Sequence, residues 1–284
     1  MKRFPLFVAA CAALAPMVRA HAANWADAIV SYSAGNTYLA PDPGVSFTPP
    51  AGAVNVSYTS PSAADFGGIT GDTGWGVLTP FNGAYSTDQM AGIGAGGSIV
   101  LQFADPVRTS GYTIGIHTGS MLADQQYPDG YAGATATPLS TPRRATIAVS
   151  AHNAGDADWY TLGTFDLNNP SNYYATGVDT PGSQMAVTAG TLADVTKPFT
   201  GSGSSFDGAY WTQMLATLDG SAGGNWIDLS SAGLSSVSYV RFTVPTGSVL
   251  YLDAVVGLPA PEPASLSLLA LGGLMLLRRR RTAR

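Results

Sequence analysis

Aspartate is the residue type in this chain that offers the most chemistry, because every acidic residue except Glu262 is an aspartate. Carboxylates in suitable arrangements bind calcium or serve as the acid and base of a glycosidase. Asp253 stands out, since it interrupts the apolar segment "YLDAVV" and a buried carboxyl needs a partner. Alternation predicts that it shares a face with Tyr251 and Val255. We predict an ion pair with Arg241 on the preceding strand, with a structural calcium ion as the alternative.

The other notable aspartates lie in segments that are rich in glycine, serine and asparagine. Aspartate favours turns, so we interpret these residues mainly as turn formers that could add ligands to a calcium site. None of them has EF-hand spacing, and they are Asp156, Asp158, Asp219 and Asp228. A glycan-active hydrolase remains a second alternative function, but no catalytic residue is assigned and we expect no enzyme activity.

Histidines and glycine-rich motifs give little support for other chemistry. His117 and His152 have no neighbouring ligand at zinc spacing, and His117 is expected to cap the strand that precedes it. The chain contains no G-x-S-x-G motif, which argues against an α/β-hydrolase triad. The stretch 92–97 matches G-x-G-x-x-G, but a predicted strand follows it instead of a helix, so we exclude a dinucleotide site. We expect these glycines to allow a close backbone approach.

Aromatic side chains in predicted loops could form a platform for sugars, because aromatic faces bury apolar area and stack well. Ordinary packing is the interpretation that we favour for each of them, and no glycan-binding residue is assigned. The residues concerned are Tyr127, Tyr131, Trp159, Tyr173, Tyr174 and Trp211.

Alternating hydrophobicity predicts that these residues are carried by β-strands. In "SIVLQF" the side chains of Ile99, Leu101 and Phe103 fall on one face. Further strands are predicted in "GYTIGIHT", near 28–33 and near 54–59. "RATIAVSA" and "DWYTLGTF" read as a hairpin across "HNAGDA", and "VSYVRFTV" and "VLYLDAVVG" as another across 245–247. With one short helix at 209–218, the pattern predicts an all-β sandwich or jelly roll.

The N-terminal segment has the pattern of a secretory signal peptide. Lys2 and Arg3 precede an apolar stretch, and small residues around Ala22 suit signal peptidase, so we predict cleavage of residues 1–22. Cys11 is the only cysteine and lies in this segment. The segment "VAAC" leaves lipidation of Cys11 open as an alternative. After cleavage the body has no thiol and needs no disulfide.

The C-terminal segment has the composition of a short membrane helix. Residues 264–277 carry no charge, and as a helix they would reach about 21 Å, which suits a marginal span of the bilayer. The run Arg278, Arg279, Arg280 and Arg281 follows directly and predicts a cytoplasmic stop. Four adjacent arginines also argue against burial of this helix in the globular body.

Pro261, Glu262 and Pro263, then the apolar stretch and the arginine run, together resemble a PEP-CTERM sorting signal. The resemblance implies recognition of the three motif residues by an exosortase in the inner membrane of a Gram-negative bacterium. The body would then reach the cell surface or the exopolysaccharide matrix. "GAGGSIVLQFADPV", "DWYTLGTFDL", "LDGSAGGNWIDLS" and "YVRFTVPTGSVLYLDAVV" resemble the domain that often precedes such tails, which implies a jelly roll similar to galactose-binding modules.

The chain is therefore predicted to comprise a signal peptide (1–22), an exported β domain (23–258) and a sorting segment (259–284). Residues 23–260 hold five basic and 17 acidic residues, a net charge of −12. Such a body is not expected to bind nucleic acid, which attracts cationic surfaces. We predict a structural or interaction role at the cell surface or in the matrix, with polysaccharide as a partner. A secreted glycan-binding module is the first alternative.

Overall fold

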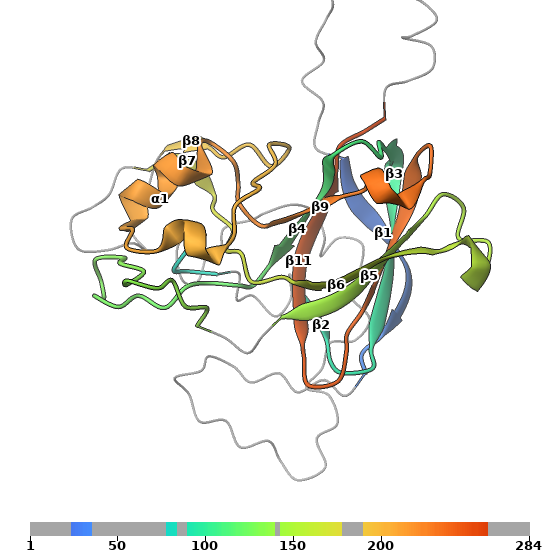
Figure 1. The fold of residues 1–284 in the computed structure, drawn as a ribbon, viewed down its shortest axis with the longest axis horizontal. Coiled ribbons are helices and arrows are strands. Elements are labelled where there is room, and N and C mark those ends of the chain that lie inside the picture. Colours follow the sequence, from blue (N-terminus) through green and yellow to red (C-terminus); the bar gives the residue numbers. More distant parts are fainter. Residues whose placement is uncertain (1–23, 36–77, 84–89, 140–142, 178–189, 261–284) are drawn as a thin grey trace, which may run out of the picture.

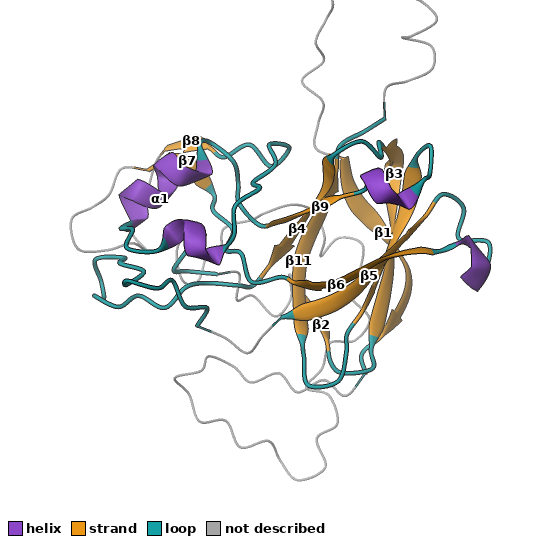
Figure 2. Cartoon of the chain, viewed as in Figure 1, coloured by secondary structure: helices purple, strands orange, loops and turns teal. Residues whose placement is uncertain are grey.

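The computed structural model describes residues 24–35, 78–83, 90–139, 143–177 and 190–260, which are mostly β-strand (Figure 2). This confirms the all-β prediction. The strands are β1 (Asn24–Ser33), β2 (Ala91–Ile93), β3 (Ser98–Val107), β4 (Tyr112–Thr118), β5 (Arg144–Ser150), β6 (Tyr160–Asp166), β7 (Tyr174–Gly177), β8 (Gly190–Leu192), β9 (Asn225–Asp228), β10 (Val237–Thr243) and β11 (Leu250–Gly257). The helix is α1 (Trp211–Leu218), and short 3-10 turns cover Asp156–Asp158, Gly203–Phe206 and Ser230–Ala232.

Nine strands form one curled antiparallel sheet in the order β6-β5-β10-β3-β1-β11-β4-β9, with β2 beside β11 (Figure 1). Strand β1 joins the two halves of this sheet. Its first residues, Asn24 and Trp25, pair with β11, and the following residues pair with β3. Register shifts at 26–28 and 29–31 mark irregularities where β1 passes along β3. Such bulges bend a strand and increase its twist, which helps the sheet to curl.

The inner side of the curled sheet holds one large hydrophobic cluster. Ile99, Leu101 and Phe103 are fully or almost fully buried in it, which confirms the alternation predicted for β3. Ile116 from β4 and Phe242 from β10 join the same cluster, although these strands belong to different halves of the sheet. Burial of apolar area from both halves therefore holds the curl together.

A second hydrophobic cluster lies on the outer side of the β4-β9-β11 half and connects it to α1. Trp226 and Val256 come from the sheet, and Trp211, Met214 and Leu218 come from the helix. The spacing of the helix residues places them on one face. The helix predicted at 209–218 is confirmed as Trp211–Leu218, and its predicted apolar residues Met214 and Leu218 are buried, whereas Leu215 is partly buried. Figure 1 shows α1 beside the separate β7-β8 pair, away from the curl.

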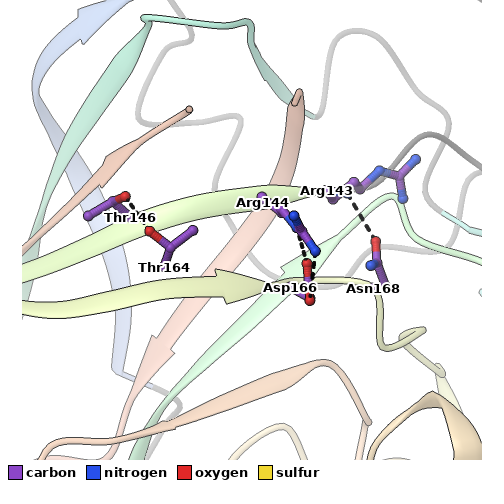
Figure 3. Close-up of polar contacts among 6 residues, drawn as sticks. All are labelled: Arg143, Arg144, Thr146, Thr164, Asp166 and Asn168. Carbon is purple, nitrogen blue, oxygen red and sulfur yellow. Dashed lines mark hydrogen bonds and ion pairs between the residues drawn. The ribbon is translucent and has the colours of Figure 1, made fainter. Parts of the chain in front are cut away.

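Strands β5 and β6 form the predicted hairpin, and β6 lies at one end of the sheet order. Polar pairs line the solvent side of this hairpin (Figure 3). Arg144 pairs with Asp166 directly across the strands, and the hydroxyl oxygens of Thr146 and Thr164 lie 2.8 Å apart. Charged side chains on a terminal strand disfavour pairing with another sheet.

The second predicted hairpin is wrong. β10 pairs with β3 and β5, whereas β11 pairs with β1, β2 and β4. The connection 244–249 therefore passes from one half of the sheet to the other, which alternation within each strand does not reveal. Strands β2, β7, β8 and β9 were not predicted, and the strand expected near 54–59 lies outside the described residues.

Candidate functional site

Asp253 lies at an irregular point of β11. Leu252 is opposite Thr118 and Ala254 is opposite His117, so Asp253 is an extra residue in the bulged strand. Its carboxyl is 2% exposed, and Oδ2 has no hydrogen-bond partner among the described residues. Burial raises the pKa of Asp253 to about 7. The bulge also shifts the alternation of inward-facing and outward-facing side chains along β11. As a result Leu252 and Val255 both lie in the inner hydrophobic cluster.

The predicted ion pair between Asp253 and Arg241 is wrong, because β10 and β11 are not neighbours in the sheet. Arg241 instead serves the β5-β6 hairpin. Its Nη1 donates to Asp156 Oδ1 at 3.3 Å, and its guanidinium lies 4.5 Å from the centre of the Trp159 ring. Arg241, which the sequence predicted to pair with the buried Asp253, therefore pairs with the exposed Asp156 instead.

A buried arginine, Arg143, contacts the strand that carries Asp253. The Arg143 guanidinium lies 5.2 Å from the centre of the Tyr251 ring, two residues before Asp253. In Figure 3 the side chains of Arg143 and Arg144 extend in different directions. Arg143 is 5% exposed, whereas the Arg144 side chain is 52% exposed and ion-paired. Adjacent arginines thus have different environments that the sequence did not distinguish.

The described residues contain no group of three or more histidine, cysteine, aspartate or glutamate side chains that could hold a metal ion. The loop aspartates serve local structure, as predicted. Asp158 accepts hydrogen bonds from Ser150 Oγ and the Ala154 amide, which lower its pKa. Asp219 pairs with Lys197 at 2.7 Å, and Asp228 accepts from the Ser230 amide at 2.8 Å. Within the described ranges, Asp253 is thus not part of a group of three or more such side chains.

His117 is buried within β4 and does not cap the strand, so that prediction was wrong. Its Nδ1 lies 3.0 Å from Ser171 Oγ, and Trp25 contacts the ring edge-on at 6.4 Å between centroids. Any side chain at Gly224 would strike the imidazole. This enclosure lowers the pKa of His117 to about 4 by desolvation. The other predicted histidine, His152, is exposed on the β5-β6 loop, 3.7 Å from Asp158.

Glycines 92–97 do not form a nucleotide site, because they connect strand β2 to strand β3. A Cβ at Gly97 would lie 2.6 Å from the Ser33 carbonyl oxygen. The close backbone approach predicted for this stretch is confirmed.

The aromatic residues proposed as a sugar platform separate into buried and exposed groups. Trp211 is 2% exposed and belongs to the second cluster, and Tyr173 and Tyr174 are partly buried against each other. Tyr127 is 70% exposed, and Tyr131 packs on Tyr210, which the sequence argument missed. We call Tyr127, Tyr131 and Tyr210 the tyrosine surface. The position of Tyr210 directly before α1 was the available signal, but the 78 residues between it and Tyr131 hid the contact.

The sorting motif Pro261, Glu262 and Pro263, the run 278–281 and the signal 1–22 lie outside the described residues. Within the described part of the chain, no helix has the length and hydrophobicity needed to cross a bilayer. No protein-family model matches the chain, and no curated protein matches it.

Proposed function

We propose that this chain is an exported protein of the cell surface or exopolysaccharide matrix, held at the inner membrane by its tail and processed there by an exosortase. In this proposal the β domain has a structural or interaction role. The observation that carries it is the order of the C-terminal residues, in which Pro261, Glu262 and Pro263 are followed by an uncharged apolar stretch and then by four arginines. The chain also begins with the residue pattern of a secretory signal peptide.

Backbone hydrogen bonds hold the last described residues of the domain. The Leu258 amide donates to the Thr113 carbonyl at 2.8 Å, and the Ala260 amide donates to the Pro106 carbonyl at 2.8 Å. The next residue is Pro261, the first of the sorting motif.

The first described strand, β1, pairs with β11 in the same part of the sheet. Asn24 is opposite Gly257 in the β1-β11 pair, and its side-chain amide donates to the Asp105 carbonyl at 2.7 Å. Removal of residues 1–22 would leave this strand whole. The two proposed targeting segments thus adjoin, in the sequence, the paired strands β1 and β11.

The composition of residues 23–260 is compatible with export and release. It contains no cysteine, so neither an oxidising nor a reducing compartment would change its covalent structure. Its net charge of −12 favours solubility through mutual repulsion. We further propose that the curled sheet is a jelly-roll-like sandwich, because strands from both halves contribute to one inner cluster.

The intact mass of the protein from envelope and from culture medium tests this proposal. We expect a released form that begins near Asn24 and ends near Ala260. Replacement of Pro261, Glu262 and Pro263 by alanine should leave the protein in the envelope with its tail attached. Arg284→Ala, which lies beyond the arginine run, is the control and should be processed normally. A wild-type protein that keeps Arg284 in the membrane would contradict the proposal.

A further inference from the structure

The tyrosine surface is built on a loop that its own side chains hold in place. The carboxylate of Asp124 accepts three backbone hydrogen bonds, from Gln126 at 2.9 Å, Tyr131 at 3.0 Å and Gly130 at 3.1 Å. The Gln125 amide also donates to the Tyr131 carbonyl at 2.8 Å. These bonds close the loop, so its residues lose little further conformational freedom when a ligand binds.

A second segment completes the tyrosine surface from far along the chain. The Tyr131 and Tyr210 rings pack at 4.7 Å between centroids with a 35° tilt. The Tyr210 hydroxyl donates to Gln126 Oε1 at 3.0 Å, and the Trp211 amide donates to the Gly130 carbonyl at 2.8 Å. The loop and the start of α1 therefore form one unit, which is anchored by the buried Trp211 side chain.

Tyr127 is the most exposed large aromatic side chain among the described residues, at 70%, and it directly follows Gln126. Tyr210 is 40% exposed. Exposed rings held on an ordered loop supply flat apolar contact area at low entropic cost. The exposed neighbours Gln125, Gln126 and Asp129 supply amide and carboxylate groups that hydrogen-bond hydroxyls.

We propose that the tyrosine surface binds a neutral polysaccharide, with a pyranose ring stacked on Tyr127 and its hydroxyls hydrogen-bonded by neighbouring polar side chains. A pyranose presents an apolar face of C–H groups and a rim of hydroxyls, which match the flat rings and the polar side chains beside them. The small aromatic area, surrounded by polar residues, suits a sugar ring better than a stable protein interface, which involves about 20–30 residues on each side.

The charge around the tyrosine surface selects against anionic glycans. Residues 109–142 and 198–240, which contain the loop and α1, include no lysine or arginine. Carboxylate or sulfate groups on a polymer would therefore find no cationic partner within these two segments and would meet Asp129, while Lys197 at the far end of α1 is paired with Asp219. The net charge of −12 for residues 23–260 opposes such polymers over longer distances. The expected ligand is thus a neutral hexose polymer.

Affinity electrophoresis in native gels tests this proposal with the protein as recovered from the producing cells. The gels contain hydroxyethyl cellulose, laminarin, galactomannan or, as the anionic comparison, alginate. We expect at least one neutral polymer to retard the protein and alginate to have no effect. Tyr127→Ala should weaken the association constant about tenfold, and Tyr127→Trp should keep or strengthen binding.

Tyr112→Ala is the matched control, since Tyr112 is 42% exposed but lies on β4 outside the tyrosine surface. It should bind like wild type. The proposal is overturned if no neutral polymer retards the protein, if alginate alone does so, or if Tyr127→Ala binds as well as wild type. Because binding is measured on the β domain, a failure of tail processing would leave this result unaffected, and the two proposals can fail separately.

Discussion

Replacing Asp253 with asparagine removes a titratable group and keeps the size and shape of the side chain. The carboxyl is 2% exposed, and burial raises its pKa from 3.8 to about 7. Between these pH values the folded protein holds a proton that the unfolded chain has released. The contribution to stability is therefore fully present below pH 3.8 and is lost as the pH rises through 7.

The size of this effect follows from the two pKa values of Asp253. A change from 3.8 to about 7 corresponds to about 4 kcal/mol, of which about 3 kcal/mol is lost between pH 4.5 and 8. Asp253→Asn does not titrate and escapes this loss. We therefore expect the free energy of unfolding of the variant, relative to wild type, to rise by about 3 kcal/mol between these two pH values.

Urea unfolding at pH 4.5 and pH 8, followed by tryptophan fluorescence, measures this difference. Asp156→Asn is the control, because the Asp156 side chain is 99% exposed. The difference in free energy of unfolding between this variant and wild type should be the same at both pH values. The reasoning would be refuted if the difference in free energy of unfolding between Asp253→Asn and wild type stayed constant or fell from pH 4.5 to pH 8. That result would show that a cation compensates the carboxylate. If that cation were calcium, EDTA would lower the stability of wild type but not of the variant.

Two further predictions concern buried positions near the sheet. Burial lowers the pKa of His117 from 6.5 to about 4, so its contribution to stability is lost as the pH falls through this range, opposite in sign to Asp253. His117→Asn should remove about 3 kcal/mol of this acid dependence in urea titrations between pH 4 and 7, and an unchanged pH profile would contradict the burial argument. Gly97→Ala should lower stability by about 1–3 kcal/mol, because its Cβ would lie 2.6 Å from the Ser33 carbonyl oxygen. Gly203→Ala should change the melting temperature little, because a Cβ at this position would meet no atom within 4 Å. Equal effects of both substitutions would refute the steric explanation.

Several features of the fold could be predicted because they depend on neighbours in sequence. Alternation in "SIVLQF" has the period of a strand and identified Ile99, Leu101 and Phe103 as core residues. The β5-β6 hairpin was predicted from two alternating segments on either side of a polar loop, and these two strands do pair. The helix was predictable from the spacing of Met214 and Leu218.

The candidate sites were harder to predict because they depend on contacts between distant segments. Asp253 was recognised as unusual from its apolar neighbours, but its expected partner depended on a hairpin that does not form. Tyr127 and Tyr131 were noted as loop aromatics, whereas Tyr210 was missed. Its ring joins Tyr131 only because Trp211 and Gly130 meet in the folded chain.

The sequence by itself determined the β-rich character of the domain, the acidic charge of the body and the composition of both terminal segments. These properties depend on residue type and local spacing, which are fixed along the chain. Only the tertiary structure decided which strands are neighbours, that Arg241 lies away from Asp253, and that Tyr210 packs on Tyr131 and bonds to Gln126. A period of two specifies which face a side chain occupies but not which strand lies beside it, and that choice depends on burying the whole inner cluster at once.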